Sequence, residues 1–96
     1  MNRNQALAAI DEIESLIDHF GSPDKDSLRT ISRHVYALHG NDGYFNEKLG
    51  SLESWGKIGF STRKFENYSG GLQQVRVFAL SDCVLLRQLI DEWPIV

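Results

Sequence analysis

The side chains of this sequence that could do chemistry include three histidines, one cysteine and several pairs of carboxylates. His34 and His39 would share one helix, but their spacing of five residues places them about 140° apart around its axis. A pair of histidines that binds a metal from one helix needs a spacing of three or four residues. We therefore expect no metal site, and we expect His34 to be a core histidine bonded to a carbonyl group.

Cys83 is the only cysteine, so the chain cannot form an internal disulfide. A reactive thiol needs a neighbour that lowers its pKa, and Asp82, the adjacent ionisable residue, would do the opposite. A cysteine on the apolar side of a helix is more often a buried structural residue. The sequence predicts an unreactive thiol in a reducing, cytoplasmic compartment.

Two glycine-containing segments resemble ligand-binding loops at first sight. In the segment Gly40–Gly43, an aspartate before a glycine is typical of calcium loops. With Gly43 at the sixth loop position, however, Leu38 and Gly40 would stand where oxygen ligands are required, so we reject calcium. No phosphate-binding pattern follows Gly70-Gly71, which we interpret as a helix stop.

Paired carboxylates are the remaining candidates for acid–base chemistry. Asp11 with Glu14, and Asp91 with Glu92, would lie on exposed faces of helices, and nothing in the sequence implies a pocket around them. We expect no catalytic residue, no metal and no cofactor. The sequence therefore predicts a protein that is not an enzyme.

The composition is that of an ordinary globular protein, with 42% hydrophobic and 24% charged residues in 96 positions. This length predicts a single helical domain over residues 1–96. Uninterrupted apolar runs are only a few residues long, far short of the roughly 20 that cross a bilayer. The first residues lack the apolar core of a signal peptide. We expect no membrane partner and a cytoplasmic location.

Helical periodicity predicts the elements that would position these side chains. A first helix is expected from about Asn4 to Phe20, where Gly21 would end it. The Ser22-Pro23-Asp24 segment predicts a turn and an N-cap, followed by a second helix that ends at His39-Gly40. A short helical turn is expected near 44–49.

The segment 51–68 can be read in two ways. As a helix it would start at Ser51 and stop before Gly70, although Gly56 and Gly59 would each cost about 1 kcal/mol relative to alanine. As strands, residues 57–79 would form a β-hairpin, and the fold would resemble a winged helix.

The last quarter of the chain decides between these readings. Nine apolar residues keep one helical face for six turns, and a strand followed by a helix has no reason to keep that phase. They are Leu72, Val75, Phe78, Ala79, Cys83, Leu86, Leu89, Ile90 and Trp93. We predict an all-α compact bundle of four main helices, in which Gly56 and Gly59 mark close approaches between helices.

A second apolar stripe on this last helix lies opposite the first and consists of Val77, Leu80 and Val84. One small core cannot easily cover both sides of a helix, so this stripe either lies under the short turn at 44–49 or meets another polypeptide. We expect these three residues to mediate self-association, most simply as a homodimer. The predicted function is a small protein-binding module, such as a regulator, inhibitor, adaptor or assembly factor.

Basic residues suggest a second partner. Residues 28–68 carry six bases and four acids, although the whole chain has a net charge of −3. The candidate partner-binding residues are Arg29, Arg33, Lys57, Arg63 and Lys64. The alternative hypothesis is a winged-helix-like regulator that binds nucleic acid through the basic 57–67 segment.

Overall fold

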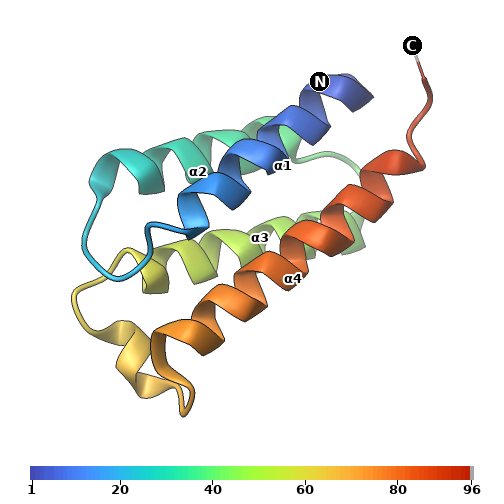
Figure 1. The fold of residues 1–96 in the computed structure, drawn as a ribbon. Coiled ribbons are helices and arrows are strands. Elements are labelled where there is room, and N and C mark those ends of the chain that lie inside the picture. Colours follow the sequence, from blue (N-terminus) through green and yellow to red (C-terminus); the bar gives the residue numbers. More distant parts are fainter. Residues whose placement is uncertain (96) are drawn as a thin grey trace.

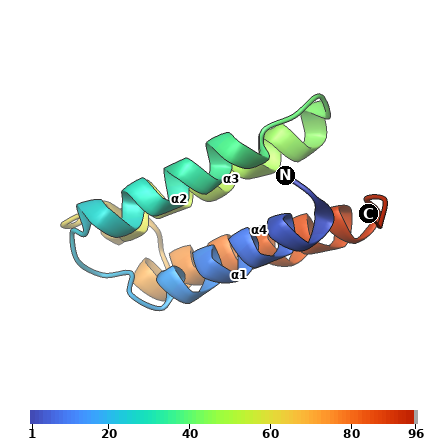
Figure 2. The same ribbon diagram turned by 90° about the horizontal axis from the view of Figure 1, so that it is seen from above.

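The chain folds into four α-helices and one short 3-10 turn in the computed structural model, which describes residues 1–95. Val96, the last residue of the predicted domain, lies outside the described residues. The elements are α1 (Arg3–Ile17), α2 (Lys25–Leu38), α3 (Gly43–Gly59), η1 (Lys64–Asn67) and α4 (Gly71–Asp91). Successive helices run in opposite directions (Figure 1), and the layer of α1 and α4 covers the layer of α2 and α3 (Figure 2). The predicted all-α bundle is confirmed.

The β-hairpin alternative is wrong, because residues 1–95 contain no strand. Residues 57–59 are the last of α3, residues 64–67 form η1, and residues 71–79 are the first turns of α4. The continuous apolar phase of the last quarter correctly indicated a single helix there. None of the described helices is both long enough and apolar enough to cross a membrane.

Short polar side chains fix where the first three helices begin. Asn2 and Gln5 form a reciprocal capping box at the start of α1. The Asp24 carboxylate accepts hydrogen bonds from the backbone and side chain of Ser27, which lower its pKa. Asp42 accepts from the first amides of α3. The N-cap of α2 was predicted within the Ser22-Pro23-Asp24 segment, and the structure places it at Asp24. The cap at Asp42 was not predicted.

The third helix differs most from its prediction. The expected short turn at 44–49 and the expected helix from Ser51 are joined through Gly50 into the single helix α3, which ends at Gly59. It ends there because Phe60 leaves the helix and packs edge-on against Phe20, with ring centroids 5.0 Å apart. The amide of Gly21 donates to the carbonyl of Gly59 at 2.9 Å, which fixes this end of the bundle.

Two glycines of α3 allow the close approaches that were predicted. A Cβ atom at Gly56 would lie 3.3 Å from the Ile31 side chain of α2. A Cβ atom at Gly59 would lie 2.3 Å from the ring of Phe20. Neither glycine has a positive φ. They are therefore required for space rather than for backbone conformation.

The core is built from the inner faces of all four helices. Helix α4 contributes its first predicted apolar face and packs mainly against α3 and α1. The buried residues of α4 are Val75, Ala79, Cys83, Leu86 and Ile90. They pack with residues of the other helices such as Ile10, Ile13, Ile17, Ile31, Leu49 and Leu52.

Candidate interaction face on the C-terminal helix

The outer side of α4 carries the three residues predicted to mediate self-association. Val77 is 47% exposed and Val84 is 52% exposed. Leu80 is half-buried and packs against the edge of the core. Together with their polar neighbours these residues form a continuous strip, which we call the α4 stripe. It consists of Gln73, Val77, Leu80, Ser81, Val84 and Gln88.

The α4 stripe is unusual in having no charged residue over about four helical turns. The outer face of a helix that meets only water is normally polar and charged. Val77 and Val84 are seven residues apart, with Leu80 between them, so the three fall on one line along the helix. This arrangement presents a narrow apolar seam to whatever lies outside α4.

Charged residues border the stripe on the side of α1. Arg87 of α4 pairs with Asp11, at 2.8 Å, and with Glu14 of α1. Partial burial disfavours the charge on Arg87, but the hydrogen bonds to Asp11 and Glu14 outweigh it and raise the pKa of the guanidinium. A shallow hollow of about 430 Å³ lies between this cluster and Leu80. The apolar seam thus has a polar rim on this side.

Aromatic rings border the stripe on the side of α3. The ring of Phe78 lies 5.1 Å from that of Trp55, which in turn lies 5.4 Å from the ring of Tyr68. Phe78 was predicted to be part of the inner apolar face, yet it is 39% exposed because it lies at the edge of that face, over Trp55. Beside it the Ser51 hydroxyl donates to Asp82 at 2.7 Å.

Sequence reasoning missed this aromatic border. Helical spacing within α3 cannot show that Trp55 meets Phe78 of α4. Large aromatic side chains that are partly exposed beside an apolar seam are typical anchors of protein interfaces. The border therefore extends the candidate face from α4 onto α3.

The basic residues predicted to bind an outside partner lie elsewhere, on α2, on α3 and around the start of η1. Three of them pair with a carboxylate close in the sequence: Arg29 with Asp26 at 3.5 Å, Lys57 with Glu53 at 3.9 Å, and Arg63 with Glu66 at 3.0 Å. The remaining two, Arg33 and Lys64, are exposed. The three ion pairs lie on the surface, so each contributes little to the stability of the fold.

The histidines and the cysteine are not brought together. His34 is bonded through Nε2 to the carboxylate of Glu12 at 2.8 Å, not to a carbonyl group as expected, because α1 and α2 lie side by side. Cys83 is fully buried. No cluster of three or more residues that could hold a metal is found within residues 1–95.

Burial makes the Cys83 thiol unreactive, because it raises the pKa to about 12. We expect a thiol reagent at pH 8 to modify the protein only after it is unfolded in urea.

The raised pKa of Cys83 also makes stability depend on pH. The unfolded chain loses the thiol proton near its ordinary pKa of 9.0, while the folded chain keeps it. Stability should therefore fall as the pH rises from about 9 towards 12.

Urea unfolding at several pH values tests this expectation, with Cys83→Ala as the control. The variant should show a flatter decline of the free energy of unfolding above pH 9. Rapid modification of the folded protein at pH 8, or an equal decline in both proteins, would contradict the assignment.

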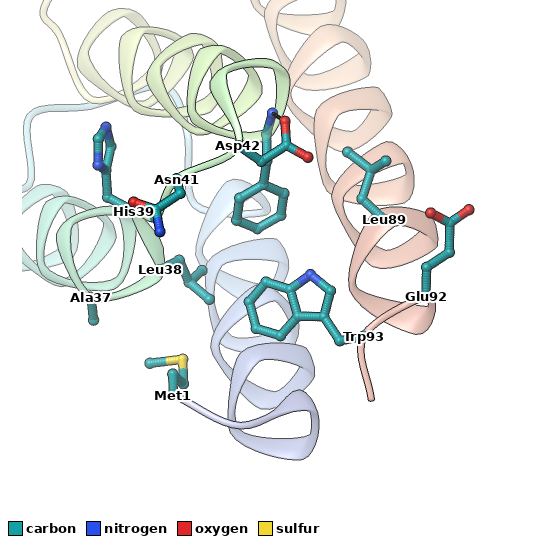
Figure 3. Close-up of a pocket in the computed structure, with 11 residues that line it drawn as sticks. Met1, Ala37, Leu38, His39, Asn41, Asp42, Leu89, Glu92 and Trp93 are labelled. Carbon is teal, nitrogen blue, oxygen red and sulfur yellow. Dashed lines mark hydrogen bonds between the residues drawn. The ribbon is translucent and has the colours of Figure 1, made fainter. Parts of the chain in front are cut away.

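One end of the bundle holds a pocket of about 520 Å³, where the chain start and the ends of α2, α3 and α4 meet. Figure 3 shows the Trp93 ring pointing across its mouth toward Leu38, while the carboxylate of Glu92 points away. The rings of Phe45 and Trp93 both line it, with centroids 5.5 Å apart. The lining residues come from three separate segments, so no local pattern predicted the pocket.

A search of known proteins gives no further guide, because no family model, no curated protein and no solved structure matches this chain.

Proposed function

We propose that this chain is a small non-enzymatic protein-binding module that self-associates through the α4 stripe. The observation that carries the proposal is that Val77 and Val84 are each about half exposed on a stripe without charge. The centres of protein interfaces are depleted in charged residues and have polar rims. The α4 stripe has both properties, since Arg87 and Asp82 flank it.

A second copy of the chain is the partner that fits this surface best. Two-fold dimers are the commonest assemblies of soluble proteins, and they form when one patch is complementary to itself. A stripe without charge meets this requirement, because no like charges come together when it faces its own copy. The exposed ring of Phe78 adds apolar area beside it.

An outside partner would then use other surfaces of the dimer, as expected for a regulator, inhibitor, adaptor or assembly factor. The basic residues Arg29, Arg33, Lys57, Arg63 and Lys64 stay a prediction for such a partner. Nucleic acid is not favoured over protein here. The β-hairpin that would have contacted a groove of the nucleic acid is not formed, because residues 57–79 contain no strand. In addition, three of the five basic residues are paired with acids.

Replacing Val84 with glutamate tests the proposed function. Two copies of an unpaired carboxylate would enter the interface, at a cost of about 2–5 kcal/mol, while the fold is retained because Val84 points outward. We expect light scattering after gel filtration to give a dimer for the unmodified protein and a folded monomer for Val84→Glu.

Tyr36→Glu is the matched control, because Tyr36 is an exposed residue of α2 and is 86% accessible. This change adds the same charge on the helix diagonal to α4 in the bundle and should leave the dimer intact. An unchanged mass for Val84→Glu, or equal dissociation of both variants, would rule out the α4 stripe as the interface.

A further inference from the structure

The order of residues in the α4 stripe is symmetric, and this symmetry specifies how two copies would meet. The inference drawn from it rests on the proposed function. Counted outward from a point between Leu80 and Ser81, a valine and then a glutamine occur at equal distances in both directions. The valines are Val77 and Val84, and the glutamines are Gln73 and Gln88. We propose that two copies of this chain pair with antiparallel α4 helices about a two-fold axis at this point.

In this register the valines and the glutamines of the seam meet residues of their own kind, while Leu80 falls opposite the partner's Ser81. Val77 lies opposite the partner's Val84, and Gln73 lies opposite the partner's Gln88. Leu80 lies beside the axis, next to its own copy. The spacing of Val77, Leu80 and Val84, three residues and then four, is that of helices packed side by side at a shallow angle.

Charge at the ends of α4 favours the antiparallel over the parallel arrangement. Glu92 is exposed at the C-terminal end, beside Asp91, whose charge is compensated by Arg3 at 3.2 Å. A parallel pair would bring the two copies of Glu92 together, and their repulsion would oppose assembly. In the antiparallel pair the two acidic ends are about 35 Å apart, at 1.5 Å of rise per residue.

The same register places each acidic end beside a complementary group. Glu92 falls opposite Ser69 of the partner subunit, next to the start of the partner's α4. Among the described residues, this helix begins at Gly71, after Gly70 at the N-cap position, without a side-chain cap and with no acid in its first turn. The N-terminus of a helix carries a partial positive charge and attracts a carboxylate. Both ends of the seam are therefore complementary in charge.

The aromatic border also fits the antiparallel pair. On the side of α3, the exposed ring of Phe78 comes opposite the segment that contains the partner's Leu85, which is half-buried. On the side of α1, the charge of Arg87 is compensated by Asp11 and Glu14 of its own chain. Phe78 thus meets an apolar side chain across the interface, and Arg87 keeps its own carboxylate partners at the rim.

Disulfide trapping between two variants that each carry one added cysteine beside the buried Cys83 tests the register. Val77→Cys and Val84→Cys are prepared separately, mixed, and oxidised with copper phenanthroline. The buried Cys83 of the unmodified protein serves as the control for background. We expect a covalent dimer only in the mixture, because residue 77 of one copy lies opposite residue 84 of the other.

Each variant alone should stay uncrosslinked. In the antiparallel pair, two copies of residue 77 lie about 10 Å apart along the helix, given 1.5 Å per residue. The Cα atoms of a disulfide lie no more than about 7 Å apart. Crosslinking of Val77→Cys with itself would show a parallel pair and overturn the register.

Two further outcomes are distinguishable. A dimer by light scattering that gives no crosslink in the mixture would show that another surface assembles the protein, and would overturn the register. A monomeric mass for the unmodified protein before oxidation would instead contradict the proposed function itself, and the register with it.

Discussion

Replacing Gly59 with alanine should lower the free energy of unfolding by about 1–3 kcal/mol, although alanine is the better helix former. The added Cβ atom would lie 2.3 Å from the ring of Phe20, far inside van der Waals contact. That ring is buried and packed edge-on against Phe60, so it cannot move aside freely. Urea unfolding followed by circular dichroism measures the loss.

Gly50→Ala is the matched control in the same helix. Gly50 is exposed, and a Cβ atom there would meet nothing within 4 Å. This substitution should raise stability by about 1 kcal/mol, the ordinary preference of a helix for alanine. The double variant Gly59→Ala with Phe20→Leu replaces the ring with a smaller side chain, which should relieve the clash with the added Cβ atom. Equal effects of the two glycine substitutions would contradict the contact between Gly59 and Phe20.

Truncating Leu86 to alanine should cost about 2–5 kcal/mol, because Leu86 is fully buried at the centre of the inner face of α4. The cost combines lost burial of apolar surface with a cavity that the neighbouring helices fill only partly. Urea unfolding of the variant and of the unmodified protein at one protein concentration measures it, since assembly adds to apparent stability.

Val84→Ala, two residues away on the outer face, is the contrasting change. It removes methyl groups that are already half exposed, and alanine favours the helix, so the stability of the monomer should stay within about 0.5 kcal/mol. Its effect should appear instead as weaker self-association at low protein concentration. A large loss of monomer stability would show that Val84 supports the fold rather than an interface.

Features encoded locally were predictable from the sequence. The apolar phase from Leu72 to Trp93 predicted α4, which extends from Gly71 to Asp91. An N-cap was predicted within the Ser22-Pro23-Asp24 segment, and Asp24 is that cap, since its side chain accepts a hydrogen bond from the amide of Ser27. The outward stripe containing Val77 and Val84 also followed from helical geometry alone.

Features that depend on contacts between distant residues were not predictable. The end of α3 at Gly59 is set by Phe60 packing against Phe20, forty positions earlier. The turn at 44–49 and the helix from Ser51 were expected to be separate elements, yet α3 begins after its N-cap Asp42 and continues through Gly50 to Gly59. Helical spacing likewise could not show that Phe78 would lie over Trp55 at the border of the candidate face.

Sedimentation equilibrium of the unmodified protein tests the central claim most directly. We predict a reversible association that approaches twice the chain mass of 10.9 kDa as the concentration rises. A mass of 10.9 kDa at every concentration would contradict the account, because the α4 stripe would then face only water.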